Sequence, residues 1–288
     1  MSRLLIVNPF ATGVTDARIA AVRRELEPVT LAATRGPGHA TELARDAGAV
    51  EAVYVFGGDG TFNEVLNGID RRIPVGFLPG GGASVLPRAL GLPRSPVGAA
   101  RRLLRAEPRS ISVGRVNGRR FSFSAGLGLD ADAVRRIDAL GRSKDGGRAG
   151  NAVFALMVVR LLLERRFRFE PALEIVGFGR ASFVFVANGS PYTYLGPLPL
   201  RFVPRARFES GLDFVAPVAI RARSVPRLGL RAFSGRLPGA RGVLAGHDLD
   251  RLEVRCDAPT ALQADGEDLG DVEHAVFEVE RDAVRVLV

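Results

Sequence analysis

The chain contains one cysteine, one lysine, three tyrosines and no tryptophan among its 288 residues. Because the cysteine is single, Cys256 excludes an internal disulfide and a cysteine-rich metal site, and we interpret it as a core residue. The shortage of aromatic rings and the lack of a nucleic-acid-binding motif argue against a nucleic-acid partner. The lysine shortage leaves no G-x-x-x-x-G-K-[ST] motif, so any phosphoryl transfer is not of the P-loop type.

Long hydrophobic runs are also missing. The longest apolar stretch, residues 153–163, is interrupted by Arg160 and is too short to span a bilayer. It has two interpretations, a core helix or a helix in contact with lipid. No signal peptide is recognised, so we expect a cytoplasmic globular protein, with length for two modest domains or one large one.

The charge is strongly positive. The formal net charge is +9, and nearly all of the basic residues are arginine. This skew is consistent with a GC-rich genome, and equally with attraction to anionic lipid or to nucleotide phosphates. We therefore keep an anionic membrane surface as a candidate partner.

The most informative stretch is FGGDGTFNEVLN at residues 56–67. Residues 52–56 before it are apolar and rich in β-formers, which predicts a buried strand. Apolar residues after it recur at helical spacing, and Thr61 with Glu64 has the spacing of a capping box. A glycine turn between a strand and a helix presents bare N–H groups to a phosphate. Asp59 would repel a phosphate unless it holds a metal ion or accepts a proton.

Two further turns have the same form. Residues 4–7 predict a strand that ends in an Asn-Pro turn from Asn8 to Gly13, with Thr15 as the cap of the next helix. Residues 73–77 predict a strand that leads into the glycine-rich segment LPGGGASVLPRALGLP at 78–93. Repeated strand-turn-helix units predict an α/β sheet with ligands at the carboxyl ends of its strands.

The second half has a different texture. An Asn117-Gly118 turn predicts a hairpin, and strands are expected at 167–176, 182–187, 200–203, 212–215, 252–256 and 260–263. Runs of strands after βα units predict a second, mainly antiparallel domain. We place the first domain at residues 1–115, with 279–288 returning to it, and the β-rich domain at 116–278.

Four ordered motifs resemble the diacylglycerol kinase catalytic family. They are the Asn-Pro turn, GGDGT, the second glycine loop and the Asp-Gly-Glu segment at 265–267. The resemblance implies a Rossmann-like domain of the NAD-kinase and diacylglycerol-kinase type, followed by an antiparallel β-rich sandwich domain. Three residues depart from the family pattern in the second loop and one at a metal position: Gly82, Ser84, Val85 and Ser210.

The resemblance also implies roles for individual residues. Glu267 would accept the proton of a lipid hydroxyl, Asp265 would support it, and Asp59 would position the nucleotide-bound magnesium or the nucleophile. Asp130 would bind the lipid head group, and Asp213 is a candidate ligand for a structural magnesium. The residues expected around ATP are Asn8, Gly13, Thr34, Gly57, Gly58, Asp59, Gly60, Thr61, Asn63, Glu64, Gly81, Gly82 and Ser84.

The predicted function is an ATP- and Mg²⁺-dependent lipid kinase that acts between the two domains at a membrane surface. A catalytically impaired lipid-binding or regulatory member of the family is the first alternative, and an NAD kinase-like enzyme is the second. NAD kinases share GGDGT but lack the Asp-Gly-Glu ending. The sequence names neither the acceptor lipid nor the oligomeric state, and a homodimer is left open.

Overall fold

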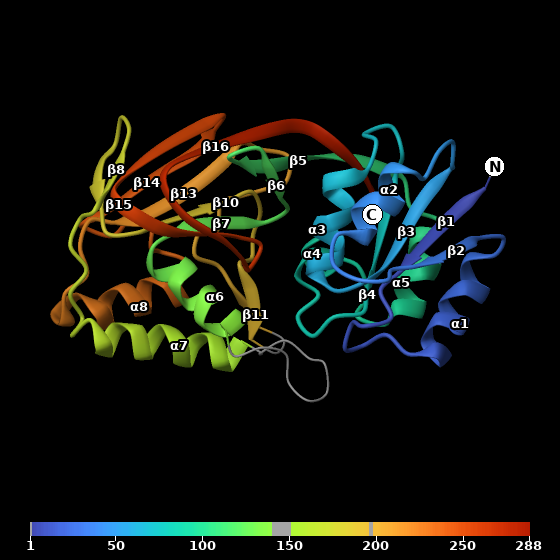
Figure 1. The fold of residues 1–288 in the computed structure, drawn as a ribbon, viewed down its shortest axis with the longest axis horizontal. Helices are drawn as coiled ribbons and strands as arrows, with labels where there is room; N and C mark the ends of the chain where they lie inside the picture. The colour runs from blue at the N-terminus through green and yellow to red at the C-terminus, as the bar shows by residue number, and fades with distance from the viewer. Residues whose placement is uncertain (1, 140–150, 196–197) are drawn as a thin grey trace. The chain divides into compact units, whose positions relative to one another are not determined.

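The computed structural model describes residues 2–139, 151–195 and 198–288 of the chain (Figure 1). It divides into two compact units. The described residues of the first unit are 2–113 and 281–288, and those of the second are 114–139, 151–195 and 198–280. The end of the chain thus belongs to the same unit as its beginning.

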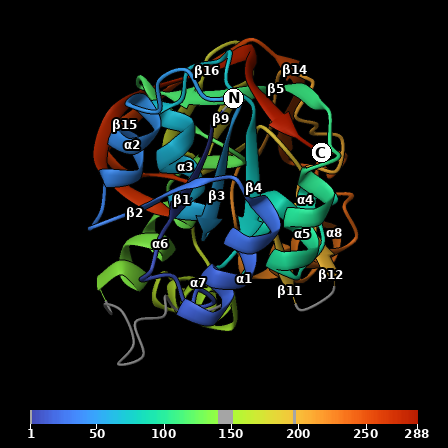
Figure 2. The ribbon, with the colours of Figure 1, turned by 90° about the vertical axis from the view of Figure 1, so that its right-hand side faces the viewer.

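The first unit is a parallel β-sheet with helices on both faces. Its strands pair in the order β4-β3-β1-β2, and the end of the last strand, β16, adds a parallel neighbour to β4. Helix α2 packs against α3, and α1 against α5; the two pairs lie on opposite sides of the strands in Figure 2. The elements are β1 (Arg3–Val7), α1 (Asp16–Leu26), β2 (Thr30–Ala33), α2 (His39–Arg45), β3 (Ala52–Gly57), α3 (Asp59–Gly68), β4 (Val75–Pro79), α4 (Val85–Ala89), α5 (Pro96–Leu103) and β16 (Glu267–Leu287).

Local sequence explains most of these elements. Strand β3 is apolar throughout and every residue in it is buried, as expected for a central parallel strand. Thr15 caps α1 as predicted, because its side chain accepts the N–H of Arg18. The predicted capping box of Thr61 and Glu64 is wrong. Helix α3 begins two residues before Thr61, after the N-cap Gly58, so Thr61 lies inside the first turn.

The second unit is built mainly of antiparallel strands. Its main sheet has the order β14-β13-β10-β7-β15-β16, and β11 and β12 form a separate two-stranded sheet. The fold class is therefore α/β followed by β, as predicted. The elements are β5 (Pro108–Val116, shared with the first unit), β6 (Arg119–Phe121), β7 (Ser124–Leu127), α6 (Leu129–Ala139), α7 (Asn151–Glu164), β8 (Leu173–Ile175), β9 (Gly179–Ala181), β10 (Val184–Ala187), β11 (Thr193–Leu195), β12 (Leu198–Leu200), β13 (Leu212–Pro217), the 3₁₀ helix η1 (Ala222–Ser224), α8 (Val225–Phe233), β14 (Val243–Leu249) and β15 (Arg251–Ala264).

The predicted hairpin at Asn117-Gly118 forms between β5 and β6. The strand predicted over 167–176 is reduced to Leu173–Ile175, because the chain turns after α7 with positive φ at Arg166 and Phe167. The two strands predicted at 252–256 and 260–263 are one strand, β15, with irregular pairing between them.

Candidate functional site

Three loops meet where the parallel strands β1, β3 and β4 end. The N–H of Gly13 donates to the carbonyl of Gly80 at 2.7 Å, and the N–H of Gly80 donates to the carbonyl of Gly57 at 2.7 Å. A Cβ built on Gly81 would lie 2.8 Å from the Gly58 Cα. The loops therefore approach each other at distances that only glycine allows.

Asn8 connects the first loop to the second. Its Nδ2 donates to the Oγ1 of Thr61 at 2.8 Å, and its own N–H donates to the carbonyl of Phe56. Thr34 is buried at the end of β2, where its N–H donates to the carbonyl of Val7. Asn8, Thr34 and Thr61 thus lie at the same edge of the sheet, as predicted for the ends of neighbouring parallel strands.

The carboxylate of Asp59 joins two loops. Its Oδ2 accepts the N–H of Val85 and its Oδ1 accepts the N–H of Leu86, each at 3.1 Å. These are the first residues of α4, so an acidic side chain of one glycine loop caps the helix that follows another. Asp59 therefore sets the spacing between the loops. Its role in positioning a metal ion or a nucleophile stays a prediction.

The altered second loop satisfies its own polar groups. Ser84 has a left-handed backbone with φ of 46°, and its hydroxyl contacts both the N–H and the carbonyl of Gly81. A Cβ on Gly82 would meet nothing within 4 Å. The loop at Gly82 is thus open to a side chain, in contrast to Gly81.

Two further residues expected around the nucleotide have partners in the protein. Asn63 is buried on α3, where its carbonyl and its Oδ1 both accept from the Nδ2 of Asn67. The Oε2 of Glu64 accepts the N–H of Ala40 at 3.1 Å, at the start of α2. Glu64 therefore stabilises the neighbouring helix rather than its own.

In the second unit, Asp265 lies in the Asp-Gly turn between β15 and β16 with φ of 47°. Its Oδ2 accepts the N–H and the hydroxyl of Ser122 at 2.6 and 2.7 Å, and its Oδ1 accepts the N–H groups of Phe123 and Ser124. Four donors to one buried carboxylate hold the turn against the segment between β6 and β7. Asp265 therefore fixes the backbone that carries Glu267.

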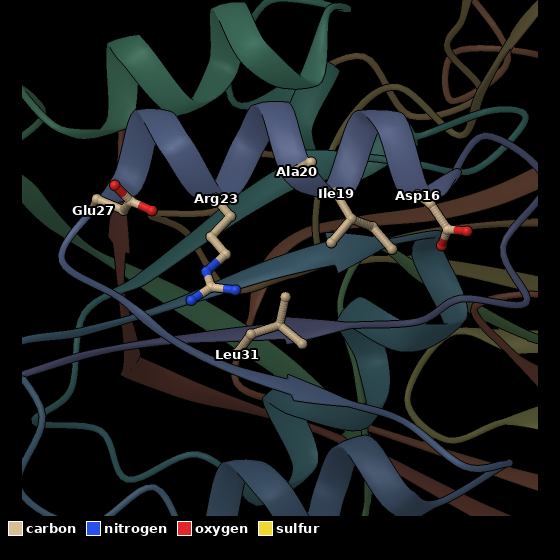
Figure 3. Close-up of a pocket in the computed structure, with 6 residues that line it drawn as sticks. All are labelled: Asp16, Ile19, Ala20, Arg23, Glu27 and Leu31. Carbon is tan, nitrogen blue, oxygen red and sulfur yellow. The ribbon is translucent and has the colours of Figure 1, made fainter.

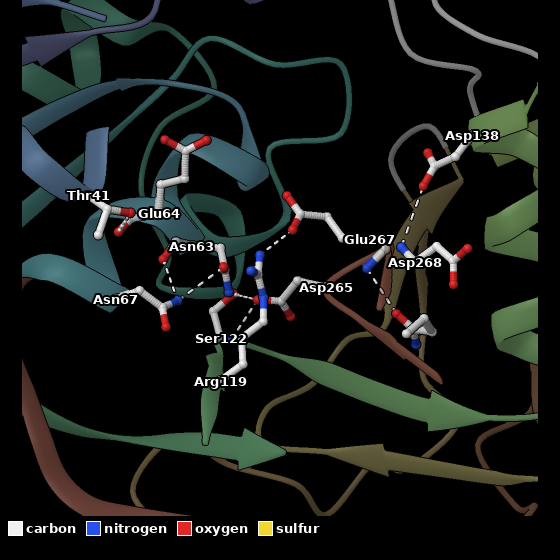
Figure 4. A network of polar contacts seen from close by, with 12 residues as sticks. Thr41, Asn63, Glu64, Asn67, Arg119, Ser122, Asp138, Asp265, Glu267 and Asp268 are labelled. Atoms are coloured by element: carbon white, nitrogen blue, oxygen red, sulfur yellow. Dashed lines mark hydrogen bonds and ion pairs between the residues drawn. The ribbon is translucent and has the colours of Figure 1, made fainter. Parts of the chain in front are cut away.

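The side chain of Glu267 forms an ion pair with Arg119 of β6 (Figure 4). Both side chains are partly exposed. An arginine-carboxylate pair orients the carboxylate and leaves it an acceptor. Arg119 was not predicted as a site residue, because its only signal in the sequence is its position directly after the Asn-Gly turn.

Asp130 is buried at the start of α6 with two polar partners. Its Oδ2 accepts from the Nε2 of Gln263 at 2.6 Å, and its Oδ1 accepts from the hydroxyl of Tyr192 at 3.3 Å. Burial raises the pKa of Asp130 to about 6, although both hydrogen bonds act in the opposite direction. The Oε1 of Gln263 also accepts the N–H of Gly266, which links Asp130 to the acidic turn. Neither Gln263 nor Tyr192 had been assigned a role.

Asp213 is fully buried on β13 and is already paired. The Nδ1 of His247 lies 2.8 Å from its Oδ1, which also accepts the N–H of Asp248. Over the described residues, no group of three or more histidine, cysteine, aspartate or glutamate side chains is arranged to hold a metal ion. A structural magnesium at Asp213 stays a prediction.

A depression of about 450 Å³ lies between α1 and β2 in the first unit (Figure 3). None of the predicted site residues is among those that line it, which are Asp16, Ile19, Ala20, Arg23, Glu27 and Leu31. It is therefore separate from the glycine loops. In the part of the chain that the structure describes, no helix combines the length and apolar character needed to cross a bilayer.

Glycine loops lie at the carboxyl ends of parallel strands in the first unit, and an antiparallel unit with an acidic turn follows along the chain. These features define an α/β protein of two units with a glycine-loop site. Residues 2–116 match the family model of the diacylglycerol kinase catalytic domain. This part of the chain is similar to the catalytic domain of diacylglycerol kinases.

Individual known proteins are also similar to this chain in sequence or in structure. A diacylglycerol kinase of Bacillus subtilis (strain 168) is 40% identical over 102 residues, which cover 33% of this chain and 34% of that protein. The chain thus matches only about a third of this relative's length. The crystal structure of a diacylglycerol kinase from Bacillus anthracis str. Sterne covers 99% of this chain and 96% of its own, with a TM-score of 0.73 and 20% identity. Another structure from the same organism reaches a TM-score of 0.80 at 22% identity, over 99% of this chain and 94% of that one. At such identity these two structures establish the fold alone.

Proposed function

We propose that the protein is a lipid kinase that transfers the γ-phosphoryl group of ATP to a hydroxyl of a diacylglycerol-like membrane lipid. The observation that carries this proposal is the meeting of three glycine loops, in a segment that matches the model of a kinase catalytic domain. Their bare backbones and the N-terminus of the ten-residue helix α3 fit the phosphates of a nucleotide.

The acidic turn supplies the second half of the chemistry. The O–H bond of the lipid breaks, its proton passes to the Glu267 carboxylate, and its oxygen bonds to the γ-phosphorus. The bond between that phosphorus and the bridging oxygen breaks, which releases ADP. Asp265 and Arg119 hold Glu267 in place. The reaction requires both units, because the loops belong to one and Glu267 to the other.

Magnesium fits this site only as a partner of the nucleotide. Both oxygens of Asp59 accept backbone N–H groups, and the described residues provide no complete ligand set of their own. We expect the phosphates to hold Mg²⁺, with Asp59 as the nearest candidate carboxylate, and the ion to neutralise phosphate charge. Asp130 remains our candidate for the lipid head group.

The test is a phosphorylation assay with radiolabelled ATP, Mg²⁺ and mixed bacterial lipids, with products identified by mass spectrometry. Glu267→Gln should lower the rate by roughly 10²- to 10⁴-fold, the usual contribution of a general base. Glu273→Gln removes the same charge from an exposed position on the same strand and should have little effect. Equal rates for wild type and Glu267→Gln would refute the assignment of the base.

The second loop supports one other candidate, a lipid-binding protein without catalysis. The Ser84 hydroxyl forms hydrogen bonds with Gly81 of its own loop. Gly82 has no hydroxyl at a position where the family commonly has threonine. ATP-independent lipid binding without any phosphorylated product would favour this candidate. Gly82→Thr is sterically allowed, because nothing lies within 4 Å of its Cβ position. A higher phosphorylation rate in Gly82→Thr than in wild type would show that the protein is an active kinase whose rate this loop limits.

A further inference from the structure

The second unit carries a depression of about 440 Å³ whose lining is almost entirely arginine. Its residues are Arg166, Arg168, Arg221, Ala222 and Arg223. No carboxylate belongs to this lining within the described part of the chain. We call these residues the arginine pocket. Its chemistry matches an anion, and the planar guanidinium group pairs well with phosphate oxygens.

The two walls of the arginine pocket are held by main-chain contacts. One wall follows α7 and the other precedes α8. Phe169 and Ile220 join the walls through a pair of backbone hydrogen bonds of 3.1 and 3.0 Å. Both residues also pack into a core cluster with Leu161 of α7 and Val225 of α8. The pocket is therefore part of the packed structure rather than a chance approach of long side chains.

Among the residues that the structure describes, three of the four arginines have no counter-charge. Arg221 pairs with Glu170 at 2.9 Å. Arg166, Arg168 and Arg223 are exposed, and none of them has an ion pair or a side-chain hydrogen bond within the described residues. Three like charges around one depression repel each other, and a bound anion would relieve that repulsion.

The helices on either side of the arginine pocket expose apolar side chains. On α7, Leu156, Val159 and Leu163 are 60%, 49% and 57% exposed, at a spacing that places them on one stripe. The other stripe of α7, which includes Met157 and Leu161, packs into the core cluster. Apolar surface therefore remains on the outer face after the core is complete.

Helix α8 repeats this arrangement. Leu230 and Phe233 are 72% and 69% exposed, whereas Leu228 and Ala232 pack inward. In Figure 1, α7 and α8 lie on the same side of the strands of the second unit. Exposed large apolar residues beside arginines are typical of a surface that inserts shallowly into the interface of a membrane.

We infer that the outer face of α7 and α8 docks on an anionic bilayer, with the phosphate of an anionic phospholipid head group in the arginine pocket and the exposed apolar side chains among the acyl chains. Charge complementarity selects this occupant, because the pocket presents three uncompensated cations beside apolar surface. The inference deepens the proposed function by naming the surface through which the enzyme would reach its lipid.

The test measures binding of the full chain to vesicles without ATP. Vesicles of phosphatidylcholine alone are compared with vesicles that also contain phosphatidylglycerol. Arg166→Gln/Arg168→Gln/Arg223→Gln should bind the anionic vesicles roughly a hundredfold more weakly, since each basic residue near such a surface contributes about fivefold. The matched control takes the same three charges from exposed arginines of the first unit, Arg24→Gln/Arg45→Gln/Arg71→Gln, and should change binding only a few fold.

Three outcomes would overturn the inference. Equal losses of vesicle binding in the two triple variants would show that binding depends on net charge rather than on the arginine pocket. Equal binding to both kinds of vesicle would show that the anionic lipid is not recognised. Thermal stabilisation by inorganic phosphate without any vesicle binding would leave a phosphate site with no docking surface. A Leu163→Gln/Phe233→Gln variant should weaken vesicle binding alone. Because the vesicle-binding assay contains no ATP, it can fail or succeed independently of the phosphorylation assay. Failure of docking and failure of the proposed kinase activity are therefore distinguishable.

Discussion

Asp130 provides a test of the second unit that does not depend on knowing the substrate. Its carboxyl is buried beside Gln263 and Tyr192, and burial raises its pKa from 3.8 to about 6. The folded state therefore favours the protonated form more than the unfolded chain does. Asp130→Asn keeps the shape and a carbonyl acceptor for Gln263, but it cannot ionise.

The sign and size of the effect follow from linkage. Because the folded pKa is raised, the native state binds more protons than the unfolded state between about pH 4 and pH 6, and the contribution of Asp130 to stability falls as pH rises. The shift of about two pKa units corresponds to about 3 kcal/mol. As pH rises from 4 to 7, the free energy of unfolding of Asp130→Asn should therefore increase by about 2 kcal/mol relative to that of wild type.

The assay is urea unfolding followed by circular dichroism across this pH range, on wild type and Asp130→Asn in parallel. Comparing the two chains cancels the many carboxylates that both retain, including Asp268 and Glu280, whose pKa values arginine partners lower. A constant difference in the free energy of unfolding from pH 4 to pH 7 would refute the reasoning. Such a result would mean that Asp130 ionises in the folded protein as it does in water.

The remaining predictions concern the second glycine loop and the Asp-Gly turn at Asp265. Gly81→Ala should weaken ATP binding, measured by calorimetry, because its Cβ would lie 2.8 Å from the backbone of the neighbouring loop, whereas Gly82→Ala should bind ATP as wild type does. Equal affinities in the two variants would contradict the close approach of the loops. Asp265→Ala should lower the free energy of unfolding by about 3 kcal/mol or more in urea, because it leaves four donors without their acceptor. A loss below about 1 kcal/mol would show that water replaces the carboxylate.

The strand-turn-helix units were predictable because their signals are local. The apolar run before GGDGT, the Asn-Pro turn and the Asn-Gly hairpin each specify their own backbone. The neighbouring positions of Asn8, Thr34 and Thr61 followed from the rule that parallel strands end at one edge.

The partners of the acidic side chains were not predictable in this way. Arg119 and Glu267 are 148 residues apart in the chain, and Gln263 and Asp130 are 133 apart. No periodicity links such pairs, because antiparallel pairing across the second unit brings them together. The capping-box prediction was wrong for a related reason. The Glu64 carboxylate accepts the N–H of Ala40 at the start of α2, a tertiary contact that overrides the local motif.

The path of β16 has a consequence for biosynthesis. This strand starts at Glu267 in the second unit and ends beside β4 in the first, where Val284 and Val286 are fully buried. A ribosome makes these residues after the rest of the second unit, so the nascent first unit lacks one strand of its sheet until then. The amino-terminal unit therefore cannot complete its sheet before residues 281–288 have been made. Truncation of the chain before Val284 would expose the flank of β4, more than two hundred residues upstream.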